Sequence, residues 1–258
     1  MTDDFFEVEI QSHAVVFNGR LFVSFQRTRQ LAKQQSPQPP PRSLGALPVH
    51  GAAEYMGRVP NEWMVPVGVF LPIVPGEAFW LGLRGSAWKP NSVKVAIGGL
   101  DAISGAAWRE GLHADPQDYV VCPPQLSLDG MYLGGQLARQ FVSVAFESET
   151  QDKKKAPGAA MRIVVYDAKE GRFSETPGTR PVLTPDVLHS FGKIGVQPGS
   201  LVAQRILSDQ HGVECWDQTK LVSLFVYWVY PDFYRAATGR EPPAPASESE
   251  GYKGYRLP

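Results

Sequence analysis

The chain has 258 residues and is close to neutral, because 25 Lys and Arg residues balance 26 Asp and Glu residues. A balanced charge argues against nucleic acid and anionic membranes as partners. With 25 Gly, 23 Pro and 11% aromatic residues, the composition favours many strands and tight turns over an all-helical fold.

The cellular compartment is predicted from the N-terminus and the cysteines. The chain begins Met-Thr-Asp-Asp, which is acidic where a signal peptide is basic. No apolar run approaches the roughly 20 residues of a membrane-spanning helix. Cys122 and Cys215 are the only cysteines, so a disulfide scaffold is not expected. We therefore predict a soluble, cytoplasmic protein.

The N-terminal region has the alternation of a β-hairpin. Apolar and acidic residues alternate over 6–10, and a second alternating run, 21–25, follows the turn signal Asn18-Gly19. The next segment, 34–41, is rich in Gln and Pro and lacks apolar periodicity. We expect an exposed proline-rich loop there; an alternative is a ligand for an SH3-type domain.

The middle of the chain carries most of the strand signals. A short helix is expected over 52–58, before Pro60, because a residue that precedes proline disfavours the helical conformation. Apolar runs separated by Gly, Pro, Asp and Ser then predict five strands. These are 68–73, 78–83, 93–97, 118–122 and 140–145.

The last third begins with a polar loop, 147–159, which contains three consecutive lysines. Strands are expected at 161–166, 201–207 and 221–229. Thr184 followed by proline predicts a helix through about residue 191, and Asp232 and Gly239 have the residue types that cap a helix over 232–238.

Together these elements predict a mainly β fold with a sandwich or barrel-like core of mostly antiparallel strands and two or three short peripheral helices. We expect one domain over 1–245, with loops at 34–46 and 147–159. The remaining residues, 246–258, are expected to form an extended or disordered tail.

Common catalytic and cofactor motifs are missing from the sequence. The five histidines lack the close spacing of a zinc site, so no metal is expected. The Gly-Gly pairs at 98–99 and 134–135 fit neither a phosphate loop nor a dinucleotide fingerprint, so no cofactor is expected. No nucleophile elbow is present.

A set of carboxylates, aromatic rings and polar side chains is the best candidate for a binding site. Its members are Asp101, Trp108, Asp118, Asp129, Arg139, Gln140, Trp216 and Asp217. Paired carboxylates move protons and aromatic faces stack on sugars, so this set suits a carbohydrate cleft. The structural alternative is that Arg139 forms a bidentate ion pair with one of the Asp residues while both tryptophans fill the core.

Several segments of the chain resemble an uncharacterised family of bacterial and fungal proteins. They are 47–50, 93–96, 101–105, 117–121, 128–130, 139–142, 216–218 and 238–243, which span most of the chain from about 45 to 245. This family has no established activity, so the resemblance implies a single structural unit without a mechanism. After Phe146 the chain departs from the family, because a Lys-rich loop replaces a Gly-rich segment.

The leading functional hypothesis is a non-catalytic binding or assembly module with an unknown protein partner or self-association. The alternative is an enzyme, possibly a hydrolase, acting on a carbohydrate or small polar substrate, with Asp101, Asp118 or Asp129 as acid or base and Arg139 binding an anionic group. A third hypothesis is a scaffold that binds partners through Pro37–Pro41.

Overall fold

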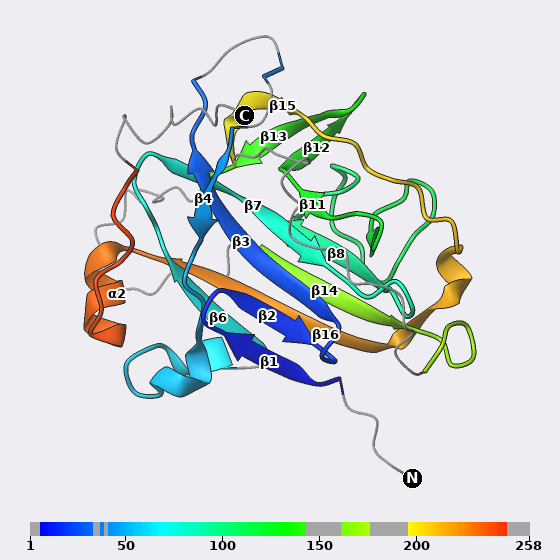
Figure 1. Cartoon of the computed structure of the whole chain (residues 1–258), viewed down its shortest axis with the longest axis horizontal. Helices are drawn as coiled ribbons and strands as arrows, with labels where there is room; N and C mark the ends of the chain where they lie inside the picture. The colour runs from blue at the N-terminus through cyan, green and yellow to red at the C-terminus, as the bar shows by residue number, and fades with distance from the viewer. Residues whose placement is uncertain are drawn as a thin grey trace, which may run out of the picture.

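A computed structural model describes residues 6–32, 37, 38, 41–64, 66–142, 161–175 and 196–246. Their strands form two sheets, so the fold is mainly β and has the sandwich form of the two expected (Figure 1). No helix among these residues is long and apolar enough to cross a membrane.

The first sheet has the order β1-β2-β3-β7-β13-β12, with β4 on β3, β11 on β7 and β15 on β13. Its pairs are antiparallel. The strands are β1 (Val8–Gln11), β2 (Ala14–Phe17), β3 (Leu21–Arg29), β4 (Ser43–Ala46), β7 (Glu77–Arg84), β11 (Ser127–Leu128), β12 (Met131–Gly134), β13 (Leu137–Phe141) and β15 (Val196–Ala203).

The second sheet has the order β10-β8-β14-β16-β6-β5, with β9 on β8. Its strands are β5 (His50–Gly51), β6 (Val67–Pro72), β8 (Asn91–Ile97), β9 (Leu100–Asp101), β10 (Val120–Cys122), β14 (Met161–Ala168) and β16 (Trp216–Val229). The β16–β6 pair is parallel and the other pairs are antiparallel.

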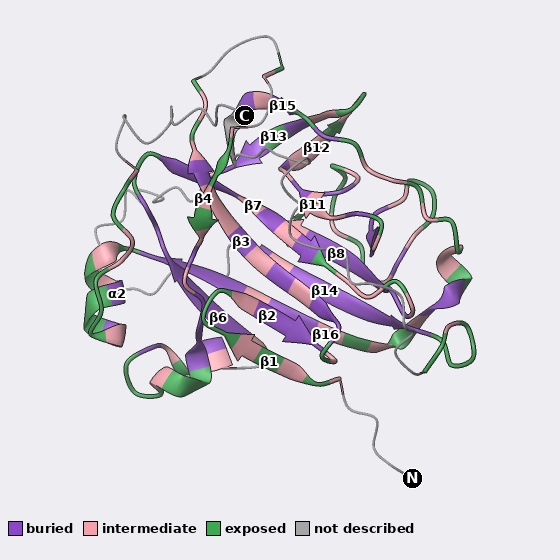
Figure 2. Cartoon of the chain, in the orientation of Figure 1, coloured by how far each residue is buried: buried purple, intermediate pink, exposed green. Residues whose placement is uncertain are grey.

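The main core lies between the two sheets. Alternate residues of β3, such as Val23 and Phe25, pack in the same cluster as Val93 and Val95 of β8. The ring of Phe79 lies 4.4 Å from that of Trp228, measured between centroids, and joins the sheets near one end. Figure 2 shows the buried residues concentrated in these strands.

The outer face of the second sheet is also covered, which explains why its central strands are apolar on both faces. At one end the cover is made by the 3₁₀ turns η1 (Ala52–Tyr55) and η2 (Asn61–Met64) and by helix α2 (Pro231–Thr238). Trp63 stacks on Tyr227 there at 4.3 Å. At the other end the cover includes η3 (Val213–Cys215) and buried residues such as Leu112 and Tyr119.

Several predicted boundaries were wrong. Strand β2 pairs with both β1 and β3, so the Asn18-Gly19 turn joins β2 to β3 and not the two runs we expected to form the hairpin. The expected helix over 52–58 is a 3₁₀ turn ending at Tyr55, and β4 lies inside the expected loop 34–46. Strand β15 ends at Ala203 rather than 207.

Helix α2 begins with Pro231, and its N-cap is Tyr230 without a side-chain hydrogen bond. The expected cap, Asp232, pairs instead with Arg235 at 2.8 Å. Gly239 ends the helix in the left-handed conformation, with φ of 69°, as its residue type predicted. The expected loop 147–159, helix 184–191 and most of the tail lie outside the described residues.

Candidate functional site

A buried lysine organises the loop that covers β8. Lys94 is fully buried, and its Nζ donates to Asp118 Oδ2 at 2.7 Å and to the carbonyls of Arg109 and Gly111 at 2.6 Å. The Trp108 ring covers it, with 4.6 Å between Nζ and the ring centroid. All three ammonium protons are therefore used inside the protein.

The carboxylate of Asp118 is held from a second direction by the same loop. Its Oδ1 accepts the His113 backbone N–H at 2.8 Å, and Oδ2 lies 2.8 Å from His113 Nδ1. Asp118 is 2% exposed. Because its lone pairs are occupied by Lys94 and His113, Asp118 anchors the loop to the sheet.

Asp101 lies in a neighbouring turn and is also buried. Its Oδ1 accepts the backbone N–H groups of Ile103 and Ser104 and the Ser104 hydroxyl, which holds the turn closed. Its Oδ2 is buried without a hydrogen-bond partner among the described residues. Burial raises the pKa of Asp101 above the usual range, with the Ser104 hydrogen bonds opposing the shift.

Asp129 follows β11 and is half-buried. Its backbone N–H and that of Gly130 donate to Gln204 Oε1. Removal of the carboxyl group from solvent raises the pKa of Asp129 to about 7, against a lowering by the Ser127 hydrogen bond. The pKa of Asp129 therefore lies near neutral pH.

The other predicted site residues have separate surroundings. Arg139 is exposed on β13 and enters none of the ion pairs between described residues, so the expected Arg139–Asp pair was wrong. Gln140 is buried and accepts the Leu31 N–H at 3.3 Å. The fully buried Trp216 donates to Asp209 Oδ2 at 2.9 Å, and Asp217 accepts from Thr219 in a turn.

Three glutamines join the segment 204–209 to the loops around β10 and β11, and the first four residues of this segment belong to the expected strand 201–207. Gln117 donates to Leu207 O at 3.0 Å and accepts the Asp209 N–H at 2.9 Å. Gln125 donates to Arg205 O at 3.1 Å and accepts the Leu207 N–H at 2.9 Å. The side-chain oxygen of Gln204 accepts the backbone N–H groups of Asp129 and Gly130. Side-chain amides thus supply the hydrogen bonds that a neighbouring strand supplies in a sheet.

A pocket of about 250 Å³ lies beside the fastened segment. The part of its lining that the structure describes contains hydroxyl, amide and apolar groups and no charged side chain. The lining residues are Ile103, Ser104, Pro116, Gln117, Tyr132, Ile206 and Ser208. The hydroxyls of Tyr132 and Ser208 make no hydrogen bond to another described residue and are available to a ligand. We call this the Tyr132 pocket.

None of the eight predicted site residues lines the Tyr132 pocket, but two of them, Asp101 and Asp118, hold the turn and the loop that supply lining residues. The Asp101 turn supplies two lining residues, and the Asp118 loop supplies two more. Sequence reasoning missed Lys94, the three glutamines and Tyr132. Lys94, in the middle of an apolar strand, was the one visible signal, since an unpaired charge is not tolerated there.

The chain matches no family model, no curated protein and no solved structure. Within the described ranges, no group of three or more His, Cys, Asp or Glu residues is arranged to hold a metal ion.

Proposed function

We propose that this chain is a non-catalytic binding module that receives an uncharged polar group of its partner in the Tyr132 pocket. The observation that supports this most directly is the lining of the pocket. Among the described residues, the lining combines the two hydroxyls of Tyr132 and Ser208, which make no hydrogen bond there, with the apolar side chains of Ile103 and Ile206, and it includes no charged side chain. Ligand sites commonly combine an apolar wall with a few polar groups that fix orientation.

The size of the pocket limits the ligand. Its volume of about 250 Å³ lies just below the roughly 300–1,000 Å³ of pockets for drug-sized molecules. It accepts one sugar ring or one neutral polar side chain of a protein partner. The hydrogen bonds of Gln117 hold one wall in place before binding, which lowers the entropy lost when a ligand binds.

The proposal is tested by saturation-transfer NMR with two neutral probes, methyl β-glucoside and N-acetylglutamine amide. We expect transfer to at least one probe and weaker binding by Tyr132→Ala, by up to about tenfold, because an aromatic contact contributes about 0.5–1.5 kcal/mol. Tyr230→Ala is the control, since Tyr230 is 46% exposed and does not line the pocket. Transfer that is equal in both variants, or absent from the native protein, would contradict the proposal.

The alternative, an enzyme acting on a carbohydrate or small polar substrate, is favoured by one observation. The pKa of Asp129, raised to about 7, suits a group that exchanges a proton near neutral pH. Hydrolysis of 4-nitrophenyl glycosides with a pH inflection near 7, lost in Asp129→Asn and kept in the exposed Asp115→Asn control, would favour the enzyme over the binding module.

We place the proposed module in the cytoplasm. What supports this location is that Cys122 and Cys215 are both buried free thiols, as expected in a reducing compartment.

A further inference from the structure

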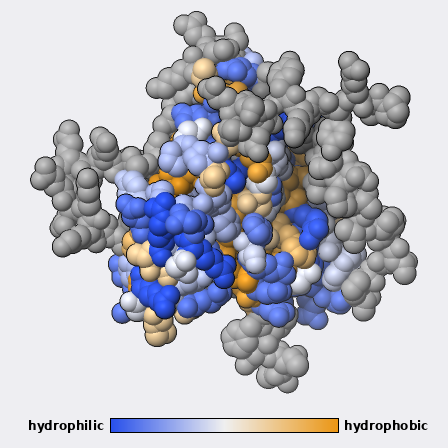
Figure 3. All heavy atoms as spheres, turned by 60° about the vertical axis from the view of Figure 1, so that its left-hand side comes forward, coloured by the Kyte–Doolittle hydropathy of each residue, from blue (hydrophilic) through white to orange (hydrophobic). Residues whose placement is uncertain are grey.

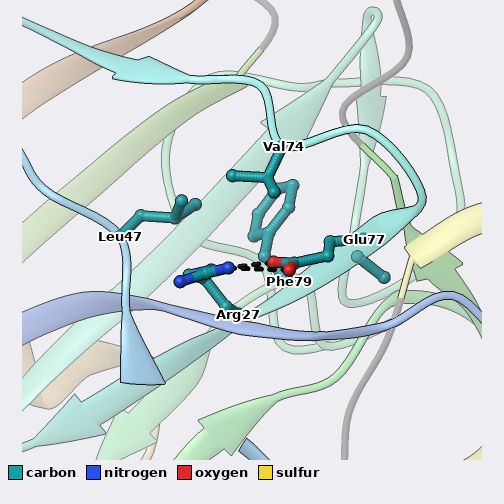
Figure 4. A pocket seen from close by; sticks show the side chains of 6 residues that line it. Arg27, Leu47, Val74, Glu77 and Phe79 are labelled. Carbon is teal, nitrogen blue, oxygen red and sulfur yellow. Dashed lines mark hydrogen bonds and ion pairs between the residues drawn. The ribbon is translucent and has the colours of Figure 1, made fainter. Parts of the chain in front are cut away.

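A buried ion pair on the first sheet binds the backbone of the chain's own C-terminal segment. Arg27 of β3 and Glu77 of β7 form a bidentate pair, with Nε–Oε2 and Nη2–Oε1 distances of 2.7 Å. Their side chains are 13% and 6% exposed. Figure 4 shows the pair enclosed by Leu47, Val74 and Phe79.

Each member of the pair makes one hydrogen bond to the segment 241–246. Arg27 Nη2 donates to the carbonyl of Ala244 at 2.7 Å, and Glu77 Oε1 accepts the N–H of Ala246 at 2.9 Å. In an extended chain, the carbonyl of one residue and the N–H two residues later lie on the same edge. The ion pair therefore contacts the edge that a neighbouring strand would contact, with charge-assisted hydrogen bonds.

The sequence of the bound segment suits this mode of binding. Glu-Pro-Pro-Ala-Pro-Ala, 241–246, has three prolines, which favour extended backbone and limit its freedom before binding. Pro245 lies between the two bonded residues, and its missing N–H leaves no donor unsatisfied there. The alanines are small, and the recognised groups are backbone atoms, so an Ala-Pro-Ala sequence is sufficient for both bonds.

The space beside the pair is nearly full. The remaining cavity is about 10 Å³, which is about the size of one water probe. A ligand at this site must therefore replace the C-terminal segment. Figure 3 shows one face of the molecule, on which hydrophobic and hydrophilic residues are interspersed.

We propose that the Arg27–Glu77 pair is a binding site for extended, proline-containing peptide segments, and that residues 241–246 occupy it in competition with such a segment of a partner. This site is separate from the Tyr132 pocket, so either proposal can fail without the other. The site differs from strand addition at a sheet edge, because β3 and β7 are both interior strands and the side chains of Arg27 and Glu77 contact the peptide backbone.

The test uses a fluorescein-labelled, C-terminally amidated peptide of the sequence Glu-Pro-Pro-Ala-Pro-Ala and a chain ending at Arg240. We expect fluorescence polarisation to show binding to the shortened chain and at least about tenfold weaker binding to the full chain, whose own segment competes at high effective concentration. Arg27→Met/Glu77→Gln in the shortened chain should lose binding. The double change avoids leaving one buried charge unpaired.

Arg84→Met in the shortened chain is the control. Arg84 is exposed at the end of the same strand as Glu77 and contacts Phe22 rather than the C-terminal segment. Equal binding by the full and shortened chains, or no binding by a shortened chain with native circular dichroism, would overturn the proposal.

A second measurement uses the full chain alone and does not depend on the truncation. Saturating unlabelled peptide should displace the segment and speed hydrogen exchange of the Ala246 amide, whereas a peptide with glycine at the three proline positions should have a smaller effect. An Ala246 exchange rate unchanged by both peptides would also overturn the proposal.

Discussion

At the scale of single residues, His50 shows how burial determines a protonation state. Its Nε2 lies 2.8 Å from the Tyr234 hydroxyl and its Nδ1 3.0 Å from the Tyr55 hydroxyl, so both ring nitrogens have partners. Burial, and then the positive charges of Arg240 and His13, lower the pKa of His50 to about 4. The neutral ring therefore links α2 and η1 at the edge of the second sheet.

This pKa predicts a loss of stability in acid. In the unfolded chain His50 takes up a proton near pH 6.5, whereas in the folded protein it does so near pH 4, so the unfolded state binds more protons between these values. Stability should fall as the pH drops from 6.5 to 4 and change little through this group below 4. The upper limit is roughly 3 kcal/mol, because each tenfold difference in proton affinity contributes about 1.4 kcal/mol.

Urea unfolding of the native protein and of His50→Gln across this pH range measures the contribution. The variant should show a smaller fall in the free energy of unfolding towards pH 4, and the exposed His211→Gln should behave like the native protein. If the native protein and His50→Gln have parallel pH profiles, His50 is not the group responsible.

At the scale of elements, the glutamines that hold the segment 204–209 should affect the hydrogen exchange of this segment without changing the stability of the whole domain. Gln125→Leu removes the hydrogen bonds to Arg205 O and from the Leu207 N–H. Each such bond contributes about 1 kcal/mol, so the Leu207 amide should exchange roughly tenfold faster or more while amides in β14 keep their protection. Gln210→Leu is the control, because the exposed Gln210 side chain donates to the nearby Ser208 carbonyl and makes no hydrogen bond to the other described loops.

Hydrogen exchange followed by NMR, which resolves single amides, measures this effect. Unchanged exchange at Leu207 in Gln125→Leu would mean that packing of Ile206 and Leu207, rather than the glutamine, holds the segment. A parallel rise in β14 would instead indicate global destabilisation.

Strands with strong alternation or continuous apolar runs could be predicted from the sequence, whereas the contacts that build the candidate site could not. Strands β3, β7 and β14 follow runs that the sequence marks clearly, because a strand with a buried face needs an apolar residue at every second position. Segment 204–207 also looked like a strand, yet glutamine side chains replace its strand partner. The Lys94–Asp118 pair joins residues 24 positions apart, and no local pattern predicts that pairing.

At the scale of the whole molecule, the sequence did not predict which strands belong to which of the two sheets. Strand β7 pairs with β3 and β13, whereas β8, the next strand in the chain, belongs to the other sheet. The last of the described strands, β16, pairs in parallel with β6, although more than half of the chain lies between them. Such pairings depend on which apolar faces meet in the core, and many different strands have equivalent faces.

The shared core leads to a final prediction about cooperativity. Leu81 of the first sheet and Leu224 of the second are both fully buried in the same cluster. If the described strands unfold as one domain, Leu81→Ala and Leu224→Ala should each lower the free energy of unfolding by about 2–5 kcal/mol. Tryptophan fluorescence and far-ultraviolet circular dichroism should then report one coincident urea transition in both variants.

Leu133→Ala is the matched control, because Leu133 is 49% exposed and should change stability by less than about 0.5 kcal/mol. In a chain of two independently folding units, Leu81→Ala would move only the transition of the first sheet and Leu224→Ala only that of the second. Two separable transitions would therefore contradict a single domain, whereas a shift of the whole transition by either variant requires the two sheets to fold and unfold together.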